Sequence, residues 1–479
     1  LEEMRRNIQI NNDKMFFVKI EFRVNAESIE ELNEKSNILR DEFSNRSCEI
    51  KPLYFKQLEA LKETLPINNN LLEENTRNMT AEGVATLFPI ARAKADTSEG
   101  IYLGRDLFTG LPINLETFSK ELSNANIAIF GIPGSGKSVA TKIITGRNVI
   151  LGRRTATIDI EGEYVKLTEN LGGRVIKVRQ GIPVGINLFD IDIDEDEDFI
   201  DIDAKITEIR AIIYGIIDKY ENRTLKPYEI ADIEKAVKEV YDERGINKDK
   251  KSIYEKEGGR IEGKITLGKI KKKMPTLSDF HRVMRDKIGN KELASTLSNF
   301  LIGNTLGVFD CQSTLKVNDQ VICFDISEIR DEIMKFYVCL VLTTWITNKY
   351  MATKERNERF VTVDEAWNIF KNKVTSDFLE DLARRARKKK VSLILATQNL
   401  AEMKQSRQAE AIVNCCDTIL LFKQPLGSID EIMTFFKLPS GTRNILLNAK
   451  PGECILIRAN TVRAVKVEMT DFESEFVTT

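Results

Sequence analysis

The sequence contains few of the residues that build metal centres. Among its 479 residues are seven cysteines and a single histidine, His281, and no two cysteines form a Cys-x-x-Cys pair. A zinc site is therefore not expected, because the usual ligands are missing at usable spacings. We interpret the scattered cysteines as buried thiols of a protein that works in a reducing compartment.

Long apolar runs and a strong net charge are also lacking. No run of 18 or more apolar residues and no signal peptide occur, and the most apolar segment, Phe336 to Trp345, contains polar threonines. We expect this segment to be a buried helix, and we do not expect the chain to cross a membrane by itself. The net charge is −2, so any contact with DNA must depend on local patches.

The length and composition of the chain indicate a folded protein of two or three domains. Hydrophobic residues make up 42% and charged residues 30% of the chain, which excludes global disorder. The chain begins with leucine, and we expect it to be the C-terminal part of a longer protein. An alternating strand pattern at 16–24, a helical stripe at 29–43 and an extended stretch at 48–54 predict the end of a small α+β domain. Together with the linker that follows it, this end of a domain covers residues 1–100.

A different pattern begins at about residue 101. Short apolar segments rich in β-branched residues recur, typical of strands buried on both faces, at 126–130, 155–160, 174–178, 320–326, 360–364, 391–396, 418–422 and 453–458. Helical segments separate several of them, which predicts a doubly wound α/β domain formed by residues 101–200 and 306–479. Between these parts, 201–305 contains isoleucine and valine stripes at helical spacing and no strand pattern, so we expect an inserted helical subdomain.

The segment 131–138, Gly-Ile-Pro-Gly-Ser-Gly-Lys-Ser, has the Walker A pattern between an apolar strand and a helix. Glycines let the backbone curl around phosphate oxygens, and the helix N-terminus favours negative charge. Lys137 is expected to reach the β- and γ-phosphates of ATP, and Ser138 to bind Mg²⁺. The alternative is an ordinary glycine turn. The predicted nucleotide-binding residues are Gly131, Pro133, Gly134, Ser135, Gly136, Lys137, Ser138 and Val139.

The strand at 360–364 ends in an Asp-Glu pair, typical of a Walker B motif. Asp364 is expected to hold the Mg²⁺ shell, and Glu365 to polarise the attacking water as general base. The alternative is a strand that ends in two solvated acids. The strand at 391–396 is followed by Thr397 and Gln398, and an amide at this position can sense the γ-phosphate; the alternative is an ordinary loop.

Basic residues crowd the segment 384–390. Three interpretations stay open: a solvated helix end, phosphate contacts with DNA, or an arginine finger from Arg384 or Arg387 that acts on a neighbouring subunit's ATP. Glu161, after the second strand, is either close to the catalytic water or a turn acid. We interpret the acids of 190–203 as a solvated helix start, the lysines of 269–273 as a solvated loop that can also meet DNA or a partner, and His281 as structural.

Taken together, these motifs resemble a known family. Their order along the chain is similar to that of the conjugal-transfer, VirB-class ATPases of type IV secretion systems (TraE/TrbE-like), within the HerA/FtsK group. The segments that carry the resemblance are 131–138, Asp-x-Glu-Gly-Glu-Tyr at 159–164, Pro-Thr-Leu-Ser-Asp-Phe at 275–280, Val-Asp-Glu-Ala-Trp at 363–367, Arg387-Lys388 and Ala-Thr-Gln at 396–398, with Leu-Phe-Pro at 87–89 and Gly104 upstream. One departure is Ile160, where relatives often have proline.

The resemblance covers residues 80–479 and implies a fold and a function. The fold is a RecA-like P-loop NTPase domain with an inserted all-helical subdomain. The implied function is an ATP-hydrolysing, Mg²⁺-dependent motor that assembles as a hexamer or lower oligomer, or is a monomer in solution. It works at the cytoplasmic face of the membrane, bound to other secretion components. The alternatives are a DNA-translocating ATPase, such as a coupling protein, and a nucleotide-gated scaffold.

Overall fold

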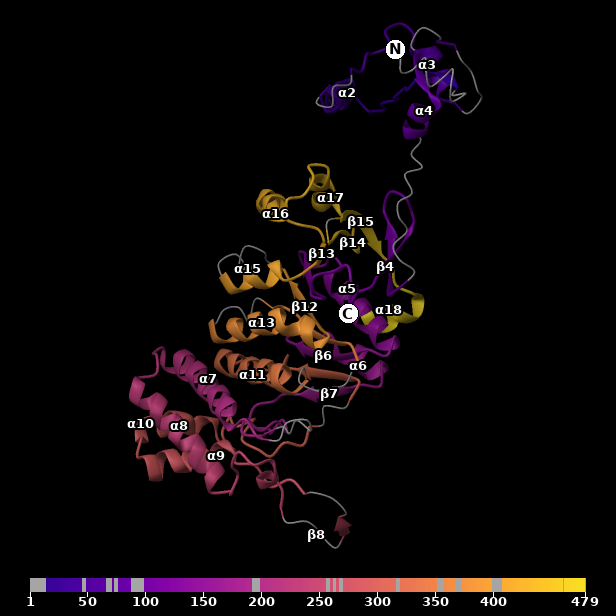
Figure 1. Ribbon diagram of the computed structural model, residues 1–479. Helices are drawn as coiled ribbons and strands as arrows, with labels where there is room; N and C mark the ends of the chain where they lie inside the picture. Colours follow the sequence, from indigo (N-terminus) through magenta and orange to yellow (C-terminus); the bar gives the residue numbers. More distant parts are fainter. Residues whose placement is uncertain are drawn as a thin grey trace, which may run out of the picture. The chain divides into compact units, whose positions relative to one another are not determined.

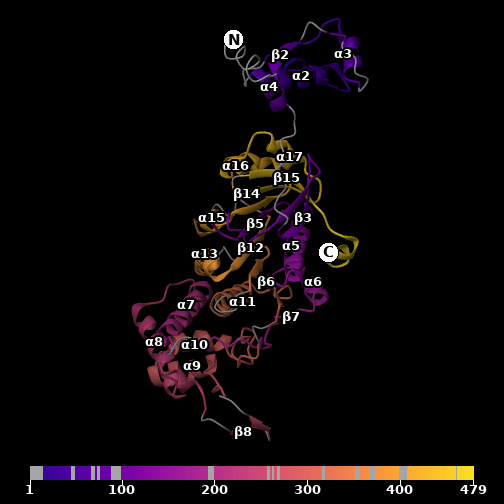
Figure 2. The ribbon, with the colours of Figure 1, turned by 45° about the vertical axis from the view of Figure 1, so that its right-hand side comes forward.

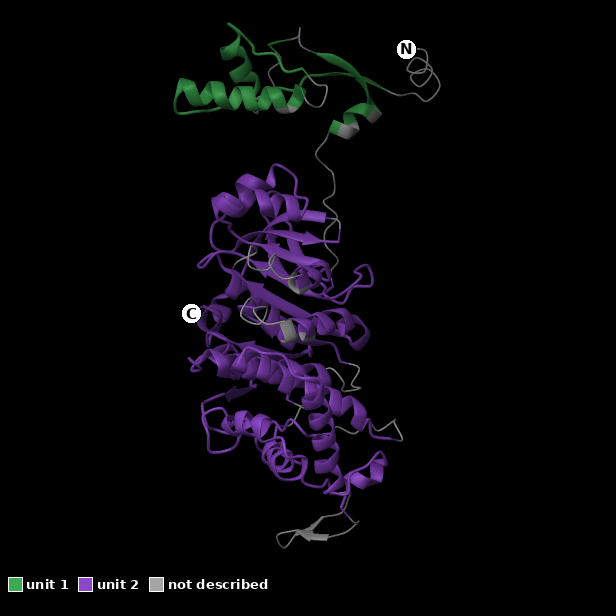
Figure 3. Ribbon diagram, turned by 90° about the vertical axis from the view of Figure 1, so that its left-hand side faces the viewer, with its two compact units in different colours: residues 1–94 green, residues 95–479 purple. Residues whose placement is uncertain are grey.

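The structure is a computed structural model in which the chain forms two compact units, residues 1–94 and 95–479 (Figure 3). It describes residues 14–44, 49–65, 71–72, 76–87, 99–191, 199–255, 259–261, 264–266, 270–315, 319–350, 357–366, 373–398, 407–459 and 461–478. Phe88, Pro89 and Trp367 of the family-like motifs lie outside the described residues, as do Cys48, Lys269 and the acids at 192–198.

The first unit is a small α+β fold that differs from the expected β-α-β piece. Its elements are β1 (Met15–Val18), α2 (Ile29–Ser44), α3 (Gln57–Glu63), β2 (Arg77–Thr80) and α4 (Ala81–Leu87). The helix expected at 29–43 is present, but the first strand ends at Val18, and the described residues 49–54 contain no strand. The partner of β1 is β2, which runs antiparallel to it. The prediction of a strand over residues 16–24 is therefore correct only as far as Val18.

The second unit is a three-layer α/β domain with a long mixed sheet. Its strands are β3 (Ile101–Asp106), β4 (Pro112–Leu115), β5 (Ile127–Phe130), β6 (Arg154–Asp159), β7 (Arg174–Lys177), β10 (Val321–Asp325), β11 (Arg359–Val363), β12 (Val391–Thr397), β13 (Thr418–Leu421), β14 (Glu453–Arg458) and β15 (Thr461–Val467). The spatial order is β4-β3-β15-β14-β13-β5-β12-β11-β6-β10-β7. All eight strands expected from the sequence are present.

Strand direction divides this sheet into two parts. The seven strands from β13 to β7 run parallel, as expected for strands buried between helices. The remaining strands, β14, β15, β3 and β4, pair antiparallel. The sequence analysis missed β3, β4 and β15, because their partly exposed residues do not form continuous apolar runs.

Helices cover both faces of the parallel part (Figures 1 and 2). One face is packed by α5 (Lys137–Ile150), α6 (Val165–Asn170) and α18 (Asp471–Val477), and the other by α11 (Glu332–Trp345), α13 (Lys373–Arg385) and α15 (Arg407–Asn414). The apolar segment at 336–345 is buried within α11, as expected. Two further helices, α16 (Ile429–Phe435) and α17 (Thr442–Asn448), lie between β13 and β14 in sequence.

The segment between β7 and β10 forms a largely helical insertion. Its helices are α7 (Ile202–Glu221), α8 (Pro227–Asp242), α9 (Leu277–Val283) and α10 (Lys291–Leu297). A short hairpin, β8 (Gly259–Ile261) and β9 (Lys264–Thr266), adds strands that the sequence pattern did not indicate. Asp201 caps α7 by accepting a hydrogen bond from the amide of Ala204, and Pro227 opens α8. Across the described part of the chain, no helix is long and apolar enough to cross a membrane.

Candidate nucleotide site

The glycine-rich segment 131–138 connects β5 to α5 at the carboxyl end of the central strands. Lys137 is the first residue of α5, and Gly136 caps the helix with φ of 98°, in the left-handed region that favours glycine. Pro133 and Gly134 form the exposed tip, whereas Gly131 and Ser135 are buried and Ser138 and Val139 are half-buried. The loop therefore has the curled backbone and the helix N-terminus that an anion site requires.

Lys137 and Glu365 form a buried ion pair at the centre of this site. Lys137 Nζ lies 2.5 Å from Glu365 Oε1, and both side chains are about 95% buried. The same carboxylate oxygen accepts a hydrogen bond of 2.8 Å from Gln398 Nε2. The structure thus brings together three residues that the sequence singled out from three different motifs.

Strand register explains this convergence. Val363 at the end of β11 pairs with Leu395 of β12, and Thr397 at the end of β12 pairs with Phe130 of β5. The residues that follow the three strands, Gly131, Asp364 and Gln398, consequently lie at one edge of the sheet. This is the edge at which open parallel sheets bind ligands.

Asp364 is buried, with 1% of its surface exposed. Burial raises its pKa to about 7; the charge of Lys137 opposes the rise and the charge of Glu365 adds to it. One Asp364 carboxylate oxygen accepts the amide of Glu365 at 2.9 Å. Glu365 itself has φ of 46°, a strained conformation for a residue with a side chain. Such strain persists where the surrounding contacts hold a side chain in one place.

Glu161 belongs to the same electrostatic environment. It follows β6, the strand beside β11. Burial raises the pKa of Glu161, and the negative charge of Glu365 contributes to the rise while Lys137 opposes it. The turn is closed by Asp159, which accepts the amides of Gly162, Glu163 and Tyr164 at 2.7–3.0 Å. The acids of this turn are thus not equivalent: Asp159 is a turn cap, and Glu161 is close enough to the ion pair to interact with it.

The two arginines lie away from this site. Arg384 is near the end of α13, exposed, and paired with Glu380 one helical turn earlier. Arg387 lies in the exposed turn Ala386–Lys389, before β12 begins. Gln398 follows the other end of β12, and at about 3.3 Å per residue the seven-residue strand separates the two edges by roughly 20 Å. Neither arginine can therefore reach the P-loop of its own chain in this arrangement.

Two other residues singled out in the sequence, Asp190 and His281, belong to the insertion between β7 and β10. Asp190 was expected in a solvated acidic run, but only 7% of it is exposed, and it pairs with Lys271 and Lys349 at 2.6 Å. Burial opposes the ionisation of Asp190, but the two ammonium groups outweigh it and lower its pKa to about 2. Burial lowers the pKa of His281, which lies on α9 away from the ion pair.

The residues at the sheet edge fit a nucleotide with Mg²⁺. A buried lysine at a helix N-terminus suits phosphate, and Ser138 with Asp364 supplies the small ligand set that Mg²⁺ uses when phosphates and water complete its shell. Within the described ranges, no group of three or more His, Cys, Asp or Glu side chains is arranged to hold a metal ion.

Comparison with known proteins agrees with this site. The sequence family described as the TraG P-loop domain matches residues 100–453. The chain belongs to this family. The expected resemblance to VirB-class secretion ATPases is confirmed by the relatives that follow.

Two curated relatives are the type IV secretion system proteins VirB4 of Bartonella henselae and Bartonella quintana. They are 26% and 25% identical over 157 residues, which is 32% of this chain and 19% of each relative. The match thus spans about a fifth of the length of these relatives. VirB4 of Thermoanaerobacter pseudethanolicus has the same fold, with a TM-score of 0.66 and 23% identity over 79% of this chain and 98% of that one. The conjugative coupling protein TrwB, without its first 70 residues, has a TM-score of 0.50 and 10% identity over 78% of this chain and 90% of that one.

Proposed function

We propose that the chain is an ATP-hydrolysing motor that energises a type IV secretion or conjugation machine. The observation that carries this proposal is the cluster formed by Lys137, Glu365 and Gln398 beside a P-loop. A P-loop alone indicates only that a nucleotide binds. A carboxylate held between the P-loop lysine and a polar amide supplies the base that hydrolysis needs.

In this proposal each side chain has one role. Lys137 and the loop amides bind the β- and γ-phosphates. Ser138 and Asp364 would hold Mg²⁺, which would neutralise charge on the phosphate oxygens. Glu365 takes the proton of the attacking water, and Gln398 orients that water and the carboxylate. The strained backbone of Glu365 supports its role as base, because strain of this kind concentrates at functional sites.

Arg387, with Arg384 as the neighbouring candidate, acts on the ATP of an adjacent subunit. Their position at the sheet edge far from the P-loop supports action between chains, as in a ring in which each subunit completes its neighbour's site. A guanidinium group matches the charge of the transferring phosphoryl group. We expect a hexamer or a lower oligomer at the cytoplasmic face of the membrane, bound to other secretion components.

Hydrolysis of ATP by the purified chain tests this proposal. We expect Mg²⁺-dependent ATPase activity that rises with protein concentration, because the site is completed by a neighbour. The Lys137→Ala variant should lose nucleotide binding or hydrolysis. Equal hydrolysis by wild type and Lys137→Ala would contradict the assignment.

A DNA-translocating ATPase is the second candidate, supported by the shared fold with TrwB. Adding DNA to the same assay separates the two functions. Steep, salt-dependent stimulation by DNA favours translocation, since phosphate contacts release counterions. Activity that depends on protein concentration but not on DNA favours the secretion motor.

A further inference from the structure

The P-loop contacts a turn that the nucleotide-binding motifs do not include. Residues 449–452 connect α17 to β14, and the amide of Gly452 donates a hydrogen bond of 2.9 Å to the carbonyl oxygen of Ser135. The two backbones touch: a Cβ placed on Gly136 would lie 2.7 Å from the nitrogen of Gly452. The turn precedes β14, which lies on the β13 side of β5, whereas Glu365 follows β11, which lies on the β12 side. The loop is therefore supported on the side opposite to Glu365.

This hydrogen bond determines the orientation of one peptide unit of the loop. The peptide between Ser135 and Gly136 is trans, as are all peptide bonds of the described chain. In a planar trans peptide the carbonyl oxygen and the amide hydrogen point in opposite directions. Since the Ser135 carbonyl points to Gly452, the Gly136 amide points away from the turn. Gly136 directly precedes Lys137, so this amide is one of the donors at the helix N-terminus.

The turn is itself held in place from several directions. The carbonyl of Gly452 accepts the amide of Val467 at 2.8 Å, and the amide of Glu453 donates to the carbonyl of Lys450 at 2.9 Å. Lys466 Nζ donates to the carbonyl of Pro451 at 2.6 Å. Gly452 has φ of 82°, which residues with a side chain rarely adopt.

We propose that Gly452 is a positioning residue for the phosphates of the nucleotide. Its amide fixes the Ser135–Gly136 peptide so that the Gly136 amide is ready to donate to a phosphate oxygen. This inference rests on the proposed function, since it assumes that the P-loop binds ATP. It also links β14, β15 and α17 to nucleotide affinity, a link that no motif in the sequence indicates.

The test is a series of substitutions at Gly452 in the full chain, measured as KM and kcat for ATP hydrolysis and Kd for ADP. Valine is strongly disfavoured at positive φ, so Gly452→Val should raise KM and Kd roughly 5- to 30-fold. Asparagine tolerates this conformation, so Gly452→Asn should change both by less than about threefold. In each variant kcat should stay within about threefold of the wild type, because Glu365 and Gln398 lie on the other side of the loop.

Gly152→Val is the matched control, because Gly152 also has a positive φ, 83°, and a Cβ there meets nothing within 4 Å. It should leave KM, Kd and kcat unchanged. If Gly452→Val does not fold, Lys466→Met removes the bond to Pro451 and should raise KM about two- to threefold. Unchanged KM and Kd in Gly452→Val and unchanged KM in Lys466→Met, or a fall in kcat and melting temperature without a change in KM, would overturn the proposal. A wild type that does not bind ATP would instead refute the proposed function.

Discussion

Glu365 is the residue that we propose as the general base. It is buried, strained at φ of 46°, paired with Lys137 and hydrogen-bonded by Gln398. A carboxylate with two donors on one oxygen has a defined orientation. The second carboxylate nearby, Glu161, is more exposed and interacts with Glu365 only through its charge. This difference makes Glu365 the better candidate for general base.

We expect Glu365→Gln to keep nucleotide binding and to lose roughly 10²–10⁴-fold in turnover, since glutamine has the same shape but cannot accept the proton. Binding of ATP by calorimetry and turnover by phosphate release are the measurements. Glu161→Gln is the matched comparison and should lose less than about tenfold. A larger loss in Glu161→Gln than in Glu365→Gln would move the base to Glu161.

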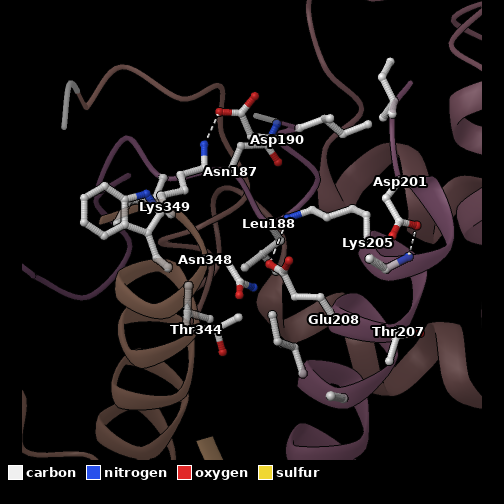
Figure 4. A pocket seen from close by; sticks show the side chains of 18 of the residues that line it. Asn187, Leu188, Asp190, Asp201, Lys205, Thr207, Glu208, Thr344, Asn348 and Lys349 are labelled. Carbon is white, nitrogen blue, oxygen red and sulfur yellow. Dashed lines mark hydrogen bonds and ion pairs between the residues drawn. The ribbon is translucent and has the colours of Figure 1, made fainter. Parts of the chain in front are cut away.

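At the scale of elements, Asp190 forms one of the links between the helical insertion and the α/β domain. A cavity of about 410 Å³ lies there, between α7 and the end of α11 (Figure 4). Asp190 lines it and binds Lys349, which follows α11, and Lys271, which precedes α9. A single buried carboxylate thus joins three segments that are distant in sequence.

We expect Asp190→Asn to lower the free energy of unfolding at pH 7 by about 2 kcal/mol, from the lowering of the Asp190 pKa from 3.8 to about 2. Since the folded-state pKa is the lower one, the stabilisation is complete above pH 4 and is lost as the pH falls toward about 2. Urea unfolding as a function of pH measures it. Asp203→Asn is the control: its exposed pair with Lys248 should contribute almost nothing. An equal effect of both substitutions would contradict the structural role of Asp190.

At the scale of the whole α/β domain, the sheet separates the candidate nucleotide site from the candidate finger. The P-loop, Glu365 and Gln398 lie at the carboxyl edge of the parallel strands, and Arg387 lies before the amino end of β12. The finger role that we propose for Arg387 therefore requires a second chain, because this separation keeps Arg387 from the P-loop of its own chain.

Arg387→Ala should reduce hydrolysis strongly, since an arginine finger contributes ~10³–10⁵ in rate. Mixing it with Lys137→Ala should restore part of the activity, because an intact Arg387 from the second variant then serves the intact P-loop of the first. Mixed oligomers are verified by co-purification of two tags. Arg385→Ala, which changes a neighbouring exposed arginine, is the control and should remain active. No rescue in verified mixed oligomers would count against a role in trans.

Several features of this protein were determined by the sequence alone. The P-loop, the Asp364-Glu365 pair and Gln398 could be predicted because each follows a short apolar strand, and parallel strands place their carboxyl ends at one edge. The eight buried strands and the helical insertion were also predictable, because burial on both faces and helical periodicity leave strong patterns. These signals are local, so a single pass along the chain finds them.

Only the tertiary structure decided the rest. The burial of Asp190, the antiparallel strands β3, β4 and β15, and the contact of Gly452 with Ser135 depend on segments that are far apart in sequence. The positive φ of Glu365 has no residue-type signal, because glutamate normally avoids that conformation. Periodicity and sequence motifs depend only on residues that are close together in the chain. The distant backbone groups and charges that contact a residue are defined only when the whole sheet has folded. The contact of Gly452 with the P-loop is of this kind.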